Sequence, residues 1–231
     1  MSNITLDPRL QLVADAVRQG ARFADVGTDH AYLPLALLDM GRLSFAVASD
    51  VAEGPLAFAR ENLREAGRES ELTLICTNGL QGMEGLSLTD IAICGMGGEL
   101  IAAILAAAPF VKDPAVRLYL QPMSRAESLR YYLAKEGFAV IAERYAVAAG
   151  RPYACLVCEY AGIPRRIDHT EAMLGDPNVR DPRDAAPFAA LLDLREREAL
   201  RRIRGRRMGG ADTAEDELLL AAIAKEREKG L

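Results

Sequence analysis

Two carboxylates flank a glycine near the start of the chain, where a short apolar run gives way to a polar loop. Asp25 precedes Gly27 and Asp29 follows it, and a helix-like segment begins a few residues later. A strand that leads into such a loop is typical of a ligand site at the carboxyl edge of an open α/β sheet. The glycine lets a ligand approach the backbone closely, because no Cβ stands in the way. The spacing therefore predicts a small-molecule site at this loop.

A third acid, Asp50, ends the next predicted strand, where a carboxylate can accept hydrogen bonds from both hydroxyls of a ribose. Dinucleotides and S-adenosylmethionine both carry a ribose, so Asp50 alone does not separate these ligands. The first loop does, because it supplies Thr28, Asp29 and His30 in place of the glycines that a pyrophosphate needs. A carboxylate repels a pyrophosphate and attracts a sulfonium or an amino group. The loop therefore favours S-adenosylmethionine.

Further candidate site residues follow the later strands. Asn78-Gly79 closes one strand and can hydrogen-bond the adenine edge of a cofactor. The Gly-rich turn at Gly95-Met96 exposes backbone N–H groups at a helix N-terminus, and Gln121-Pro122 lies next along the same rim. The turn lacks the Asp/Asn-Pro-Pro-aromatic motif of adenine N6-methyltransferases. It therefore predicts an open floor to the site.

Strands and helices alternate around these residues. Asp7-Pro8 opens a first helix that Gly20 stops, because aspartate caps a helix and proline suits its first turn. Strands are predicted over 22–26, 44–50, 72–76, 90–94, 116–120, 138–146 and 153–160, and further helices over 33–40, 54–66, 98–108 and 125–136. The alternation implies right-handed crossovers and a parallel sheet. The final pair of strands is joined by a short Gly-Pro turn over 149–152, so the last strand should run antiparallel.

This order of elements resembles a Rossmann-like class I methyltransferase, an α/β fold with a mostly parallel seven-stranded sheet and an antiparallel last strand. Residues 1–162 are predicted to form that domain, which would bind S-adenosylmethionine. A linker with several prolines follows, and helical spacing then predicts helices over 184–205 and 213–229. Their leucines should face each other in an antiparallel hairpin or short coiled coil. Residues 163–231 are therefore predicted to be a helical appendage.

The net charge of −5 argues against a uniformly basic nucleic-acid-binding protein. However, residues 163–207 hold 11 basic and 8 acidic residues, and the basic ones are arginines that include Arg201, Arg202 and Arg206. Arginine suits phosphate because its planar guanidinium can bond two oxygens at once. The alternative is a solvated helix face with internal ion pairs.

Several other classes of protein are disfavoured. Cys155 and Cys158 form a C-x-x-C, but within a strand this odd separation puts the thiols on opposite faces, which favours core packing over a metal or redox role. Only two histidines are present, so no metal site is expected. No apolar run reaches the roughly 20 residues that span a bilayer, and residues 1–10 hold no signal-peptide core. A cytoplasmic protein with no membrane partner is expected.

Six phrases occur in order along the chain. They are Asp25-Val-Gly-Thr-Asp-His-Ala-Tyr-Leu-Pro34, Glu53-Gly54-Pro55-Leu56 with Asn62, Ile93-Cys-Gly-Met-Gly-Gly98, Leu120-Gln-Pro-Met123, Leu129-Arg130 with Leu133, and Gly137-Phe138. This set is similar to the bacterial tRNA adenine-22 N1-methyltransferase family. The resemblance covers residues 8–162 and continues loosely to the C-terminus. One departure is Leu174-Gly175-Asp176-Pro177, where the family tends to show an aromatic-Gly-Pro phrase.

The resemblance implies methyl transfer from S-adenosylmethionine to N1 of an adenosine in tRNA, which leaves S-adenosylhomocysteine. N1 of neutral adenine carries a lone pair, so it can attack without losing a proton, and Asp29 is the candidate to stabilise the positive charge that develops. The predicted cofactor contacts are Asp25, Gly27, Thr28, His30, Asp50, Val51, Asn78, Gly79, Gly95 and Met96. The predicted tRNA contacts are Tyr32, Gln121, Pro122, Arg201, Arg202 and Arg206.

Three alternatives stay open at this point. A methyltransferase that acts on a small molecule or a protein would share the fold and the cofactor. An NAD-dependent enzyme would bind a nicotinamide dinucleotide instead. A non-catalytic module would bind cofactor and RNA only. The expected partner is tRNA and a monomer is favoured, although an apolar helix face serves a hairpin or a dimer equally well.

Overall fold

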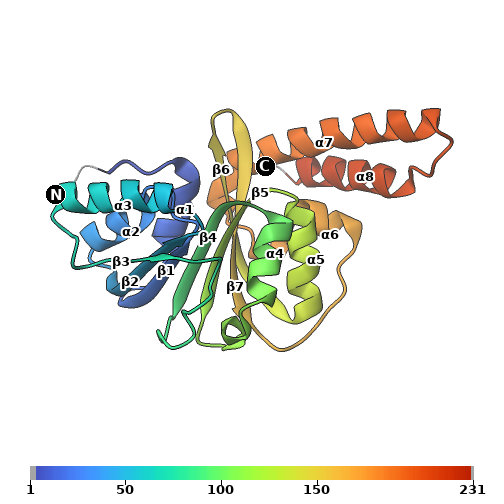
Figure 1. The fold of residues 1–231 in the computed structure, drawn as a ribbon. Coiled ribbons are helices and arrows are strands. Elements are labelled where there is room, and N and C mark those ends of the chain that lie inside the picture. The colour runs from blue at the N-terminus through green and yellow to red at the C-terminus, as the bar shows by residue number, and fades with distance from the viewer. Residues whose placement is uncertain (1–3, 230–231) are drawn as a thin grey trace.

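The computed structural model describes residues 4–229, which form a seven-stranded sheet between two layers of helices (Figure 1). The strands lie in the order β3-β2-β1-β4-β5-β7-β6, and β7 pairs antiparallel with both of its neighbours, so it runs opposite to the other six strands. This confirms the predicted fold and its antiparallel last strand. The strands are β1 Ala21–Val26, β2 Leu43–Asp50, β3 Thr73–Cys76, β4 Asp90–Gly97, β5 Arg117–Ser124, β6 Phe138–Ala148 and β7 Arg151–Tyr160.

Helices cover both faces of the sheet. One layer consists of α1 Pro8–Ala16, α2 Tyr32–Asp39 and α3 Glu53–Ala66, and the other of α4 Gly98–Ala106 and α5 Ala126–Glu136. Successive strand residues face opposite layers, so Ala46 and Ala48 pack with α2 and α3 whereas Val47 packs in the core on the other face. Asp7 caps α1 by accepting the Arg9 N–H, as its sequence predicted.

The strands β4 and β5 continue beyond their predicted ends and pair as far as Gly97 and Ser124. A register shift at Met96 interrupts the pairing, next to Gly95, whose φ is +78°. Such a bulge bends a strand and redirects the residues that follow it. The dipeptide Gln121-Pro122 therefore lies inside β5 rather than after it.

The hairpin of β6 and β7 turns at Ala149-Gly150, so its turn is shorter than predicted. Cys155 and Cys158 are free and fully buried, and they belong to the cores on opposite faces of the sheet. This confirms their predicted role in packing. Burial raises the pKa of the Cys155 thiol to about 12, which suppresses the reactive thiolate.

Three α-helices follow β7 in the described part of the chain: α6 His169–Leu174, α7 Ala185–Met208 and α8 Ala214–Glu228. The last two lie side by side and project beyond the sheet, as Figure 1 shows. This confirms the predicted helical hairpin. Within residues 4–229, no helix is long and apolar enough to cross a membrane, and no cluster of three His, Cys, Asp or Glu side chains could hold a metal ion.

Buried ion pairs attach these C-terminal helices to the sheet. Arg130 on α5 donates to Glu143 on β6 at 2.8 Å, and the two side chains are only 5% and 1% exposed. Its guanidinium also donates to the backbone carbonyl of Ala172 in α6. Arg144 pairs at 2.8 Å with Asp184, which immediately precedes α7. These contacts fix α6 and the start of α7 against the edge of the sheet that β6 forms.

Candidate functional site

The loop between β1 and α2 is held by the end of β2. Gly27 has φ +77°, a left-handed conformation that favours glycine. Its N–H and that of Thr28 both donate to the Ser49 carbonyl, at 2.8 and 2.9 Å. The buried Ser49 hydroxyl donates in turn to the Gly79 carbonyl at 3.3 Å. The sequence prediction missed Ser49, although its place directly before a strand-ending acid signals such a supporting role.

Asp25 lies on β1 just before this loop, and only 6% of its surface is exposed. Burial raises the pKa of its carboxyl from 3.8 to about 6, because the charged form is poorly solvated there. A cationic or amino group placed beside the loop would stabilise the charged form. The structure therefore places, at the predicted ligand site, a buried carboxylate whose charged form a positive group would stabilise.

The replacement Asp25→Asn is expected to stabilise the protein above pH 6. The unfolded carboxyl loses its proton near pH 3.8 and the folded one near 6, so the folded state binds more protons between these values. Folding stability from this group therefore falls as the pH rises through that window, by about 3 kcal/mol in total. Urea unfolding of both proteins at pH 4 and pH 7.5 measures the effect. An equal pH dependence in the two proteins would contradict the buried ionisation.

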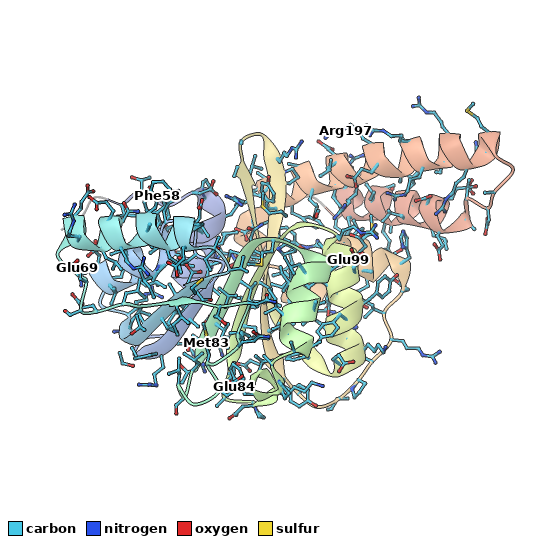
Figure 2. The ribbon with its side chains drawn as sticks, in the orientation of Figure 1. Phe58, Glu69, Met83, Glu84, Glu99 and Arg197 are labelled. Carbon is cyan, nitrogen blue, oxygen red and sulfur yellow. The ribbon has the colours of Figure 1, made fainter. Side chains whose placement is uncertain are left out.

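Asp29 projects from the same loop with 80% of its side chain exposed, and its Oδ2 lies 3.5 Å from His30 Nε2. The His30 ring stacks on Tyr32 and contacts Phe58, with ring centroids 5.3 and 5.2 Å apart. The Asn62 amide holds this segment by donating to the His30 carbonyl at 2.8 Å. Figure 2 labels Phe58 on α3 beside the loop. An exposed acid thus adjoins a partly exposed aromatic surface, which suits a planar base.

The ends of β1, β2 and β3 meet at one edge of the sheet. Asp50 is partly exposed there, and its Oδ1 accepts the Ala52 N–H at 2.9 Å. Val51 follows as an exposed apolar side chain. The turn after β3 begins with the exposed Asn78, and a cavity of about 130 Å³ lies between this turn and α4. The predicted residues from all three strands are therefore brought together.

Gln121, predicted to contact tRNA, is fully buried. Its Oε1 accepts the Gly95 N–H at 3.1 Å and a guanidinium N–H of Arg9 at 3.4 Å, and its Nε2 donates to the Pro122 carbonyl at 3.3 Å. The Gln121 amide is occupied by hydrogen bonds within the protein, so it supports the β4 bulge and does not contact RNA. Arg9 was missed, because nothing local marks a helix residue that reaches a strand 112 residues away.

Met96 follows the bulge and reaches back toward β1. A Cβ on Gly27 would collide with Met96 Cε. Two predicted cofactor contacts therefore meet directly, and any side chain at position 27 would displace the methionine. The unbranched thioether can itself move aside, because methionine has three flexible side-chain bonds.

The arginines of α7 lie on two opposite faces. Arg202 and Arg206 approach the same carboxylate, that of Asp216 on α8, at 2.8 and 3.2 Å, and Asp216 is 1% exposed. Arg201 is exposed and has no ion-pair partner within residues 4–229. At about 100° per residue, Arg197 shares the face of Arg201, and Figure 2 shows Arg197 on the side of α7 away from α8. Internal ion pairs therefore account for the inner face only.

The donors and charges of this site fit S-adenosylmethionine better than a dinucleotide. The N–H groups of Gly27 and Thr28 are both bonded to Ser49, so they are not free to hold a pyrophosphate. Carboxylates at Asp29 and Asp50 lie along the same edge and would repel phosphate. A ligand with ribose hydroxyls and a positive charge meets an acceptor at each of these places.

Comparisons with known proteins agree with this geometry. A family model described as a methyltransferase domain matches residues 6–156. The tRNA (adenine(22)-N(1))-methyltransferase of Bacillus subtilis is 36% identical over 159 residues, which are 69% of this chain and 67% of that protein. The B. subtilis m1A22 tRNA methyltransferase TrmK matches in structure with TM-score 0.76 and 30% identity, over 98% of this chain and 97% of the other.

Sp1610 of Streptococcus pneumoniae, solved in complex with S-adenosyl-L-methionine, matches with TM-score 0.80 and 31% identity, over 95% of this chain and 99% of the other. The two structural matches extend across both the sheet and the C-terminal helices. An acidic loop after β1, a second acid at the end of β2 and this degree of similarity lead to one conclusion. The chain belongs to the tRNA (adenine(22)-N(1))-methyltransferase family.

Proposed function

We propose that this protein transfers a methyl group from S-adenosylmethionine to N1 of adenosine 22 in tRNA, giving 1-methyladenosine and S-adenosylhomocysteine. The observation that carries the proposal is the loop after β1, where the exposed Asp29 follows backbone N–H groups already bonded to Ser49. Such a loop suits a sulfonium and not a pyrophosphate. The 36% identical B. subtilis relative supports tRNA and N1 as the target.

The proposed cofactor contacts lie along one edge of the sheet. Asp50 would accept hydrogen bonds from the ribose hydroxyls, and Val51 and Asn78 would contact the adenine. The residues proposed to surround the rest of the cofactor are Asp25, Gly27, Thr28, His30, Gly79, Gly95 and Met96. When bound, S-adenosylmethionine supplies an electrophilic methyl group.

The proposed part of the protein in the reaction is to orient the base and to stabilise its charge. Adenine N1 needs no general base, because its lone pair is free, but methylation leaves the ring cationic. Asp29 provides a carboxylate for that charge as it develops. Because N1 lies on the Watson–Crick edge, the adenosine must be unpaired or turned out of its stack. Tyr32 and Pro122 are proposed to shape the pocket that receives it.

The C-terminal helices are proposed to bind the tRNA. Residues 1–162 would act as the catalytic domain and residues 163–231 as an RNA-binding appendage, with Arg201, Arg202 and Arg206 contacting phosphates. Contacts of this kind set affinity and position rather than sequence choice. A tRNA substrate also extends the proposal to a cytoplasmic enzyme. The favoured monomeric state stays a prediction.

A methylation assay on unmodified tRNA tests the function directly. The protein is incubated with S-adenosylmethionine and a tRNA transcript that has adenosine at position 22, and the nucleosides are analysed by mass spectrometry. We expect 1-methyladenosine from this transcript and none from a matched transcript with guanosine at that position. A protein that modifies neither transcript would instead be a small-molecule or protein methyltransferase, or a non-catalytic module. A thermal shift with NAD but not with S-adenosylhomocysteine would indicate the dinucleotide alternative.

A further inference from the structure

A cavity of about 750 Å³ lies between the sheet and the C-terminal helices, and we call it the α5–α7 cavity. Its walls are the end of β5, the first turn of α5, the start of β7 and one face of α7. Its volume falls within the range of about 300–1,000 Å³ that is usual for ligand sites. The buried Pro122 and the exposed Met123 are among its lining residues, and their neighbour Gln121 supports the bulge at Gly95. The cavity therefore adjoins the carboxyl end of β5, which lies at the same edge of the sheet as the proposed active site.

The lining of this cavity has unused hydrogen-bond donors. Six arginines and three carboxylates line it. Among them, Arg151 is exposed, and the structure of residues 4–229 gives it no ion-pair partner. Arg195 Nε and Arg202 Nη2 are buried donors without a hydrogen-bond partner among the described residues, and the buried Asp216 Oδ2, which also accepts no hydrogen bond there, lies 3.2 Å from Arg206 Nη1. Buried donors rarely stay unpaired in native proteins, so the two donors indicate an acceptor that enters from outside.

The first turn of α5 adds a second kind of donor. Ala126, Glu127 and Ser128 line the cavity, and they are the first three residues of this 11-residue helix. Arg125 precedes them with φ +57°, and no described side chain caps the turn. The free N–H groups and the positive end of the helix dipole both favour an anion. Arginine side chains and backbone N–H groups thus converge on one space from different elements.

We propose that the α5–α7 cavity binds a backbone phosphate of the RNA strand that carries the target adenosine. The inference rests on the proposed function, because its ligand is that same tRNA. Arg151, Arg202 and the first turn of α5 supply the donors, and the phosphate oxygens accept. Asp216 is a positioning residue, since it holds the Arg202 Nε and leaves the Nη2 free. Because the cavity lies at the end of β5, beside the proposed active site, the phosphate it would bind is one close to the methylated base.

Two variants test the site without disturbing a buried ion pair. Arg151→Met removes an exposed guanidinium, and we expect the Kd for an unmodified tRNA transcript to rise about tenfold. The slope of log Kd against log salt should fall by about one. Ser128→Glu adds an acid to the first turn of α5, where it suits the helix dipole. We expect this variant to melt at the same temperature or higher and still to bind tRNA about tenfold more weakly.

Arg166→Met is the matched control. Arg166 is exposed and lacks an ion-pair partner in the described chain, and the adjacent Arg165 N–H bonds the Ala134 carbonyl toward the far end of α5. The Arg166→Met variant should leave the tRNA affinity and the salt slope unchanged. If the wild type methylates tRNA while Arg151→Met and Ser128→Glu bind it normally, the phosphate site is rejected and the proposed function stands. If the wild type neither binds nor methylates tRNA, the proposed function itself fails.

Discussion

The replacement Asp29→Asn is expected to lower kcat for tRNA methylation about 100-fold, and separately to weaken S-adenosylmethionine binding, because the same carboxylate attracts the sulfonium. Removal of one charge-stabilising group from an active site typically costs this much. Adenine N1 gains a positive charge during transfer, and the proposed carboxylate stabilises the transition state more than the neutral base. Single-turnover rates at saturating tRNA, together with the cofactor Kd from calorimetry, measure the two effects separately.

The position of Asp29 makes this test clean. Its side chain is 80% exposed and its Oδ2 lies 3.5 Å from the partly exposed His30, so its removal leaves no buried partner behind. Asp29→Glu serves as the control, because it keeps the charge one methylene further out and should recover part of the rate. An Asp29→Ala enzyme with wild-type turnover and intact cofactor affinity would exclude this residue from the chemistry.

Much of the site could be predicted because its signals are local. Asp25, Gly27 and Asp50 stand where apolar runs end, and parallel strands bring such ends to one edge. The presence of glycine also predicts the left-handed backbone conformation at position 27, because a φ of +77° suits few other residues. Residue type and position therefore identify these loops before any contact is known.

The roles that sequence did not reveal depend on contacts between distant elements. Gln121 was expected at the RNA surface, but the fold buries it between Arg9 and Gly95. Asp216 has the pattern of a first-turn helix acid, yet the packing of α7 against α8 makes it the buried partner of two arginines. A local pattern shows that a side chain can donate or accept, and the tertiary packing determines where its partner lies.

The two faces of α7 show why charge counting alone left two alternatives. The inner arginines at 202 and 206 form ion pairs with Asp216, whereas the outer Arg201 is exposed. Both alternatives, internal ion pairs and a free cationic surface, therefore apply to the same helix. A guanidinium with several N–H groups can also hold a carboxylate with one edge and keep another edge free. Ion pairing within the hairpin thus orients donors without using all of them.

Charge reversal at Arg201, Arg202 and Arg206 is expected to abolish tRNA binding under conditions where the wild type binds. Loss of three phosphate contacts lowers the salt slope of binding by about 2 to 3, and the new carboxylates add repulsion. In an assay at about 0.1 M salt, we expect the Kd for tRNA to rise at least about 100-fold. Fluorescence anisotropy with labelled tRNA measures the Kd, and a S-adenosylhomocysteine thermal shift shows that the catalytic domain is intact.

The inner positions require a second variant, because reversal there would place new carboxylates against Asp216, which is 1% exposed. A triple change to glutamine combined with Asp216→Asn removes the arginine charges and the buried acid together, so Asp216 is not left as a buried charge without its arginine partners. It should weaken tRNA binding as well, with an unchanged melting temperature. A matched triple reversal at Arg64, Arg166 and Arg183, which are exposed elsewhere, should retain most of the affinity. If the α7 variants bind tRNA as tightly as this control, the helix is not the RNA surface, and Arg202 supplies no donor to a phosphate in the α5–α7 cavity.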